Sequence, residues 1–305
     1  MPAANLSYPE AGVTKAADLA PDISIDYVNR FSQGVERLRK LLGMTNLIPV
    51  ADGGTVKTYK YTSDIKDGNV AEGEYIPLSK VSRTLDQTIA LTLNKWRRNT
   101  TAEAVQSKGR DRAINDTDAK FISGLQGNIK SDLLSAVTGT QKTAPKGKTI
   151  QAALSNMWAA LETIFEDYDG FGDIDDDGVP PFVFFVNPTD VAAYLGTATI
   201  TTQTAFGMSY IKDFLGLGTT FTSAKVPAGT VFGTAAQNLN IAYVPASGGD
   251  LAQTFGLTSD ATGMLGMTHA VITTNASIDT LVMGGVKVFP EVSDAVLKGT
   301  ITPGV

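Results

Sequence analysis

The sequence predicts an α+β fold, and three parts of its hydrophobic pattern support this prediction. Residues 116–138 carry apolar side chains at helical spacing and form the strongest predicted helix. Residues 47–98 favour strands on both sides of an Asp67-Gly68-Asn69 turn, which is typical of a long two-stranded excursion. From residue 219 onward the pattern consists of short strands and turns. Long helices and many strands therefore share one chain.

The N-terminal region is expected to be a loose arm followed by a helix. Residues 1–24 are small, polar and interrupted by prolines, so they have no core of their own. Because termini are ordered only when something holds them, we expect a neighbouring subunit to hold this arm. Between Ile25 and Leu42 apolar residues recur at helical spacing, and Gly43 follows as a stop signal.

The region after that helix predicts a β-hairpin. Residues 56–62 favour strand, and residues 84–93 alternate as a strand does. An isolated two-stranded hairpin is marginal in water. This one is therefore expected to lie on its own body or on another subunit.

The middle of the chain predicts helices and one buried strand. A separate helical segment is expected at 101–108, and Thr117 is the predicted cap of the helix over 116–138. Apolar spacing predicts another amphipathic helix at 149–167. The remaining predicted elements are a buried strand at 182–186, a short helix from Asn187-Pro188 to Leu195, and strands at 220–226, 231–232, 241–244, 270–274 and 280–289.

Composition and charge exclude several functional classes. The chain has no cysteine, so disulfides and thiolate metal sites are excluded. Its net charge of −6 argues against a protein whose main task is to grip nucleic acid. The basic run Lys95–Arg98 is balanced by nearby acids and is interpreted as a solvated or inter-subunit ion-pair surface. The first residues lack the basic start and following apolar run that are typical of a signal peptide. No apolar run in the sequence is long enough to span a membrane.

Catalytic and metal-binding signals are sparse, so the chain is predicted not to be an enzyme. His269 is the single histidine, and a structural or surface role is expected for it. Residues 173–178 match the opening of a calcium loop, but Phe184 stands where the closing glutamate is required. Pro180 and Pro181 also prevent the exiting helix. We therefore expect an acidic surface turn there, and no catalytic residue, cofactor or metal ion in the chain.

Three stretches resemble one known protein family. Residues 69–80, NVAEGEYIPLSK, look like an extension loop whose tip reads Glu-Gly-Glu followed by Pro and Lys. Residues 182–190, FVFFVNPTD, are similar to the strand and Asn-Pro helix of that family's axial domain. The helix over 116–138 is placed like the family's spine helix. In this order, the stretches resemble the major capsid proteins of tailed bacteriophages, which have the Hong Kong 97-like fold.

The resemblance implies a division of the chain into familiar parts. They are the N-terminal arm and first helix at 1–48, the extension loop at 49–99, the peripheral domain with the spine helix at 100–148, the axial domain at 149–267, and a return to the peripheral domain at 268–305.

The resemblance also implies a structural function, which is to form the icosahedral shell around packaged double-stranded DNA. Copies would assemble as hexamers and pentamers in the bacterial host cytoplasm and reside in the virion capsid, without sequence-specific DNA binding or a membrane. The implied partners are a portal protein, a decoration protein and, since the arm from Met1 is short, a separate scaffolding protein. An encapsulin-type compartment is the alternative within the fold, and a non-shell α/β binding protein or hydrolase is the alternative outside it.

Five residues are the expected inter-subunit contacts. The hairpin should lie across an adjacent subunit, where its acidic tip, Glu72 and Glu74, would meet basic partners. Arg110 and Arg112 are the best candidates for those partners. Lys80 lies on the extension loop, and some family members join subunits through a Lys–Asn isopeptide bond, but nothing in the sequence singles out Lys80 for that reaction.

Overall fold

The computed structural model describes most of the chain after residue 46. The predicted arm over 1–24 and the acidic turn at 173–178 lie outside the described residues. Of the predicted first helix, Phe31 and residues 33–36 are described, and they are helical. The described residues are 31, 33–36, 47–139, 142–166, 181–195, 202–205, 208–259 and 262–302.

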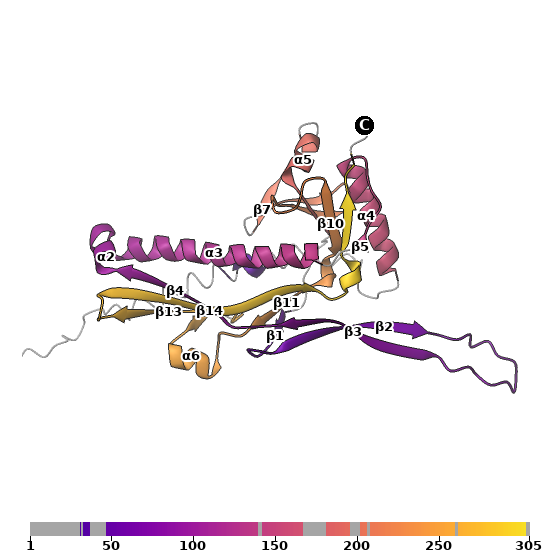
Figure 1. Ribbon diagram of the computed structural model, residues 1–305, viewed down its shortest axis with the longest axis horizontal. Coiled ribbons are helices and arrows are strands. Elements are labelled where there is room, and N and C mark those ends of the chain that lie inside the picture. Colours follow the sequence, from indigo (N-terminus) through magenta and orange to yellow (C-terminus); the bar gives the residue numbers. More distant parts are fainter. Residues whose placement is uncertain are drawn as a thin grey trace, which may run out of the picture. The chain divides into compact units, whose positions relative to one another are not determined.

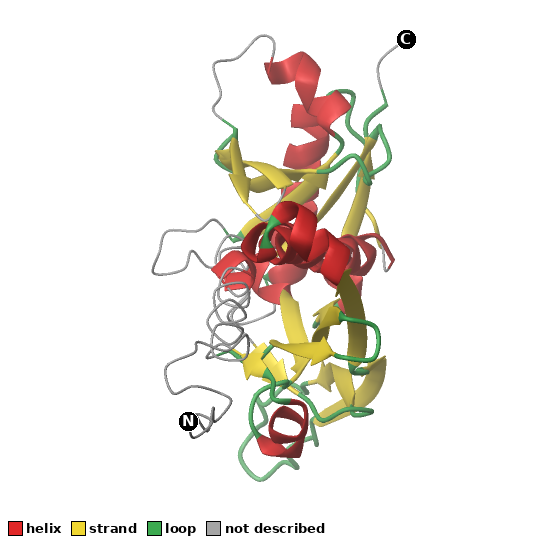
Figure 2. Ribbon diagram, turned by 90° about the vertical axis from the view of Figure 1, so that its left-hand side faces the viewer, coloured by secondary structure: helices red, strands yellow, loops and turns green. Residues whose placement is uncertain are grey.

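The described part of the chain contains both helices and strands, as the α+β prediction requires (Figure 2). It divides into two compact units. The predicted domain boundaries remain predictions. The first unit comprises Met1–Gln33, Leu93–Gln126 and Val244–Gly285, and the second comprises Gly34–Thr92, Gly127–Tyr243 and Val286–Val305.

The first unit is built on an antiparallel sheet. Strand β14 pairs with β4 along one edge and with β13 along the other, and β13 pairs with the short β12. β14 leaves this unit after Gly285 and continues into the second. The elements are β4 (Asn94–Thr101), α2 (Ala102–Lys108), α6 (Gly249–Phe255), β12 (Thr258–Ser259), β13 (Leu265–Ile272) and β14 (Ser277–Pro290).

The long helix α3 (Arg110–Gly139) starts earlier than predicted (Figure 1). Thr117 lies inside it, so the prediction that Thr117 caps the helix is wrong. The real boundary is Gly109, whose φ of 81° places it in the left-handed region that favours glycine. This residue separates α3 from α2, which confirms the predicted helical segment at 101–108.

The second unit contains a mixed sheet around the predicted buried strand. All five residues of β6 are buried, and β6 pairs in parallel with β9 and antiparallel with β10. In the described part of the chain the strand order is β5 (Lys142–Thr143), β15 (Leu297–Thr300), β10 (Thr230–Ala235), β6 (Phe182–Val186), β9 (Gly218–Thr222), β8 (Met208–Phe214) and β7 (Gln203–Ala205).

The second unit also contains elements outside that sheet. Helix α4 (Ile150–Phe165) begins where predicted, because the Thr149 hydroxyl accepts a hydrogen bond from the Ala152 amide at 3.2 Å. Strand β1 (Leu47–Pro49) pairs in parallel with β11 (Leu239–Val244). Strands β7 and β8 were not predicted. The others are β2 (Thr55–Asp64), β3 (Lys80–Ala90), α5 (Pro188–Leu195) and the short 3₁₀ helices η1 (Ala236–Asn238) and η2 (Ser293–Ala295).

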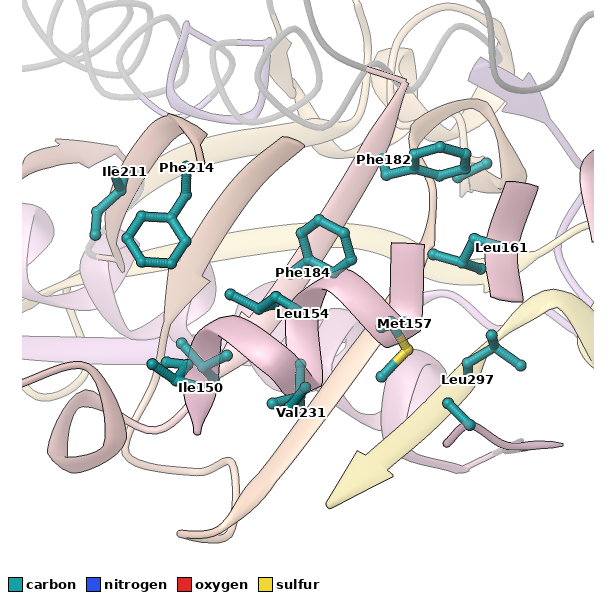
Figure 3. Close-up of a cluster of buried hydrophobic side chains, with 14 of the residues drawn as sticks. Ile150, Leu154, Met157, Leu161, Phe182, Phe184, Ile211, Phe214, Val231 and Leu297 are labelled. Atoms are coloured by element: carbon teal, nitrogen blue, oxygen red, sulfur yellow. The ribbon is translucent and has the colours of Figure 1, made fainter. Parts of the chain in front are cut away.

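A hydrophobic core joins α4 to the sheet of the second unit (Figure 3). Leu154, Met157 and Leu161 point from the helix toward Phe184 of β6. The close approach depends on Gly233 of β10, where a Cβ atom would meet Met157 and Phe184 atoms at 2.9 Å. Burial of each such side chain contributes about 1.5–3 kcal/mol. This unit therefore has a core of its own.

A matched pair of leucine substitutions tests this core. Leu161 is 0 % exposed and Leu78 is 91 % exposed. Leu161→Ala should lower the free energy of unfolding by about 2–5 kcal/mol, because it removes buried methyl groups and leaves a cavity. Leu78→Ala should change it by less than about 0.5 kcal/mol in the unassembled protein. Urea unfolding of both variants measures the difference, and equal midpoints would contradict the packing described.

Candidate assembly interface

Strands β2 and β3 form a hairpin that is a sheet by itself (Figure 1). The pairing is antiparallel and runs from Thr55 opposite Ala90 to Asp64 opposite Lys80. The register shifts after Thr58, which leaves Asp86 as an extra residue in β3. The hairpin predicted from the alternating pattern is therefore present.

The connection between β2 and β3 presents apolar side chains to solvent. Tyr75 is 99 % exposed, Ile76 71 % and Leu78 91 %. The strand-end residues Ile65 and Val81 are exposed as well. Contiguous exposed apolar groups mark interaction surfaces more often than single exposed side chains do. We call residues 65–79 the hairpin tip.

Within the second unit, Lys60, midway along β2, ties the hairpin to η2. Its Nζ lies 2.9 Å from Asp86 Oδ1 and 2.6 Å from Asp294 Oδ2. The Ser293 hydroxyl donates to Asp86 Oδ1 at 2.9 Å. In addition, Gln87 Nε2 donates to the Pro290 carbonyl at 3.3 Å. We call Lys60, Asp86, Ser293 and Asp294 the hairpin anchor.

The pKa values of two anchor residues are shifted toward their charged forms. Burial opposes ionisation of Asp86, but hydrogen bonds from Lys60 and Ser293 outweigh burial and hold the pKa of Asp86 below its ordinary value. Burial also opposes the charge on Lys60, yet its hydrogen bonds to Asp294 and Asp86 raise the pKa of Lys60. At neutral pH both groups are charged and attract each other.

Next to the anchor, an arginine stacks on aromatic rings. The Arg83 guanidinium carbon lies 3.3 Å from the centre of the Tyr59 ring and 5.9 Å from that of Tyr61. Such cation–π contacts contribute about 0.5–1 kcal/mol each at exposed sites. This stacking links β3 to β2 on one face of the hairpin.

A groove of about 290 Å³ lies beside β2. Its lining combines the apolar Ile48, Val56 and Phe289 with polar side chains. The polar ones are Lys57, Thr58, Tyr59, Tyr61, Asn240 and Glu291. We call it the β2 groove.

The structure places only some of the predicted contact residues. Glu72, Glu74 and Lys80 are exposed on the hairpin. Arg110 and Arg112 lie in the first turn of α3, but their side chains are outside the described set. The pairing of the two glutamates with the two arginines stays a prediction.

The single histidine is part of a buried polar cluster in the first unit. His269 Nε2 lies 2.8 Å from Asp118 Oδ2, and Arg98 lies 2.6 Å from Asp118 Oδ1. The Thr280 hydroxyl also donates to Asp118 at 3.3 Å. These contacts tie α3 to β4, β13 and β14, as expected for a structural histidine. Arg98, predicted to lie on an ion-pair surface, instead has a side chain that is 18 % exposed.

Other site types have little support in the described part of the chain. No group of three or more His, Asp or Glu side chains gathers there in a way that could hold a metal ion. None of the helices searched among the described residues is long and apolar enough to cross a membrane.

Comparisons with known proteins find similarity in structure alone. Neither a family model nor a curated protein matches the sequence. A chain of the holo-SrpI encapsulin complex from Synechococcus elongatus matches with TM-score 0.52 and 14 % identity, covering 86 % of each chain. The bacteriophage PhiM1 mature capsid matches with TM-score 0.52, 10 % identity and 86 % coverage of each chain. The capsid of the native GTA particle matches with TM-score 0.52 and 11 % identity, covering 86 % of this chain and 90 % of that one.

These similarities define the fold of the chain. It is the Hong Kong 97-like capsid fold, which the order of elements in the sequence predicted. At 10–14 % identity the likeness concerns the arrangement of the backbone, not individual side chains.

The sequence reasoning missed the hairpin anchor. Lys60 and Asp294 are 234 positions apart, and neither belongs to a recognisable motif. Asp86 gave no local signal, because Leu85, Gln87 and Ile89 alternate without a break and leave Asp86 on the opposite face of the predicted strand. The bulge at Asp86 and its ion-pair partner become visible only in the folded chain.

The anchor predicts a pH dependence of hairpin stability. Because the folded pKa of Asp86 is lowered, its contribution is present above the unfolded value of about 3.9 and is lost as pH falls through the folded pKa. Asp86→Asn should reduce the hydrogen-exchange protection of β2 and β3 amides about tenfold at neutral pH. It should also remove the part of the acid dependence that Asp86 contributes.

The matched control for this experiment is Asp64→Asn. Asp64 is an exposed carboxylate at the other end of β2, paired with Lys66 at 2.8 Å. Exposed pairs contribute about 0–1 kcal/mol, so this variant should keep nearly full protection. If both variants lose protection equally, the special role of Asp86 is contradicted.

Proposed function

We propose that this chain is the major capsid protein of a tailed bacteriophage, and that its copies assemble into an icosahedral shell around double-stranded DNA. The fold supports the proposal, because the similar structures include capsid chains. The observation that carries it is the hairpin tip, where apolar residues are exposed on a ribbon that is tied to its own unit through Lys60, midway along β2.

The proposed driving force is burial of the hairpin tip on an adjacent subunit. Tyr75, Ile76 and Leu78 expose apolar area whose removal from water contributes about 25 cal/mol per Å². A closed shell repeats one such contact many times, so a modest contribution at each position is sufficient. Weak individual contacts also allow wrongly placed subunits to leave during assembly.

In this proposal, charges on the hairpin tip orient the adjacent subunits relative to each other. Glu72 and Glu74 meet Arg110 and Arg112 of the neighbouring subunit. Exposed ion pairs contribute only about 0–1 kcal/mol each, so they select geometry more than they add affinity.

The proposed assembly has no catalytic step, and the chain acts as a structural protein. Its proposed partners are further copies of itself in hexamers and pentamers, a separate scaffolding protein, a portal protein and a decoration protein. Its proposed location is the virion capsid after assembly in the bacterial cytoplasm.

An encapsulin-type compartment is the second candidate function, and the similarity to the SrpI encapsulin chain favours it. The two candidates differ in what the shell contains. Shells isolated from the native source would hold double-stranded DNA under the first proposal and a protein cargo under the second.

Electron microscopy of the purified protein tests shell formation. Negative-stain images should show closed shells or ring-shaped capsomers, because exposed hairpin tips drive association. A protein that stays monomeric at high concentration would contradict both candidate functions.

Charge reversal at the hairpin tip tests its role. The double variant Glu72→Lys and Glu74→Lys should lower shell yield and heat resistance, because it places like charges opposite basic partners. The control Glu162→Lys and Glu166→Lys makes the same charge change on exposed positions of α4 and its cap. Normal yield and heat resistance of the Glu72/Glu74 variant would show that the tip assignment is wrong.

A further inference from the structure

Two aspartate–glycine pairs lie in exposed turns next to the strands of the hairpin. Asp52-Gly53 precedes β2, and Asp67-Gly68 lies in the hairpin tip. In such a pair the glycine has no side chain to shield its amide nitrogen, so this nitrogen can attack the aspartate carboxyl carbon. The hydrogen bonding and backbone conformation of each glycine therefore determine whether the attack occurs.

The Asp52-Gly53 pair is held in a turn that engages the glycine amide. Gly53 donates its amide hydrogen to the Leu91 carbonyl at 3.1 Å, and the Leu91 amide donates to the Gly54 carbonyl at 3.0 Å. Leu91 is only 2 % exposed, so this contact is anchored in the core. The φ of Gly53 is 73°, in the left-handed region that favours glycine. Glycine is therefore required by the turn, and its nitrogen is engaged.

Gly68 in the hairpin tip has neither of these constraints. Its amide donates no hydrogen bond to any other described residue. It is not among the glycines with positive φ, and a Cβ atom placed on it would meet no atom within 4 Å. Neither the backbone conformation nor packing within the single chain therefore requires glycine at position 68.

The carboxyl group of Asp67 is held beside this amide. The Asn69 amide donates to Asp67 Oδ1 at 2.9 Å, which closes an Asx turn across Gly68. The turn keeps the side-chain carboxyl on the Gly68 side of the backbone, and such proximity favours an intramolecular reaction. The hairpin tip thus combines a nearby carboxyl carbon with an unshielded, unbonded amide nitrogen.

We propose that Asp67-Gly68 is a spontaneous modification site, where Asp67 isomerises to isoaspartate and the hairpin tip then loses its competence for assembly. The Gly68 nitrogen gives up its proton and bonds to Cγ of the protonated Asp67 carboxyl. The bond from Cγ to its hydroxyl oxygen breaks, and water leaves. A second water molecule then opens the resulting succinimide at the main-chain carbonyl carbon of Asp67, breaking its bond to the Gly68 nitrogen. Nothing is oxidised or reduced, and the water that is lost is regained.

The product changes the backbone of the hairpin tip. The chain now runs through Cβ and Cγ of residue 67, which lengthens it by one carbon atom, and the former main-chain carbonyl carbon carries the carboxylate. The side-chain oxygen that accepted from Asn69 has become a peptide oxygen, so the Asx turn is lost. The effect on assembly rests on the proposed shell function, whereas the chemistry at Asp67 does not.

Peptide mapping by mass spectrometry, calibrated with synthetic isoaspartyl peptides, tests the chemistry in unassembled protein incubated at physiological temperature. Isoaspartate should accumulate about tenfold faster at position 67 than at position 52, because the Gly53 hydrogen bond must open before that amide can react. The pairs Asp169-Gly170 and Asp177-Gly178 lie outside the described residues, and the map resolves them separately. Equal rates at positions 52 and 67, or no isoaspartate at 67, would overturn the proposal.

The matched control is Gly68→Ala. The added Cβ atom meets open space, so the single chain should fold normally, but it shields the amide nitrogen. This variant should lose most of the isoaspartate at position 67 and keep the level at position 52. After equal incubation, the shell yield of the original protein should fall in proportion to its isoaspartate at 67, while Gly68→Ala should keep the yield of fresh protein. Equal losses of yield in both would overturn the effect on assembly.

The outcomes distinguish this inference from the proposed function. Isoaspartate at position 67 with an undiminished shell yield overturns the effect on assembly and leaves the proposed function intact. Fresh protein that forms no shells contradicts the proposed function and with it the effect on assembly. The peptide map then still supports or overturns the chemistry at Asp67, because that measurement uses unassembled protein.

Discussion

The Lys60 ammonium between Asp86 and Asp294 is the contact on which the position of the hairpin depends. A two-stranded ribbon has no third strand and no covering helix, so its own pairing stabilises it only marginally. The ion pair, the Ser293 hydrogen bonds and the Gln87 contact join the ribbon to η2 and to Pro290 within the same unit. Arg83 of β3, stacked on Tyr59 of β2, adds a contact between the two strands beside this ion pair.

The anchor and the tip of the hairpin therefore meet different physical requirements. At the anchor, charges are partly shielded from water and satisfied within the chain, which holds β2 and β3 against η2. At the tip, Tyr75, Ile76 and Leu78 remain in water, where their apolar area favours association with another surface. The side chains of the core around α4 and β6 are already buried within one unit, so they expose no comparable apolar area to water. Association can thus use the tip without disturbing that core.

Inside the two units, buried charged side chains are paired with partners from the same unit. Asp118 is fully buried, and its carboxylate is satisfied by His269, Arg98 and Thr280. Removing one partner from such a cluster leaves a charge unpaired in a region of low dielectric, which is costly. The β2 groove differs because Thr58 Oγ1 and Asn240 Oδ1 have no such partners among the described residues.

Local pattern was sufficient for the long helix, the buried strand Phe182–Val186, the helix after Thr149 and the hairpin, because spacing and capping act over a few residues. The composition also showed directly that the chain has no cysteine and one histidine. Pattern was insufficient for the start of α3, where Gly109 and not Thr117 sets the boundary. Lys60 with Asp294, and Thr58 with Asn240, come together only through folding, since each pair is far apart in the chain and their burial depends on the elements packed around them.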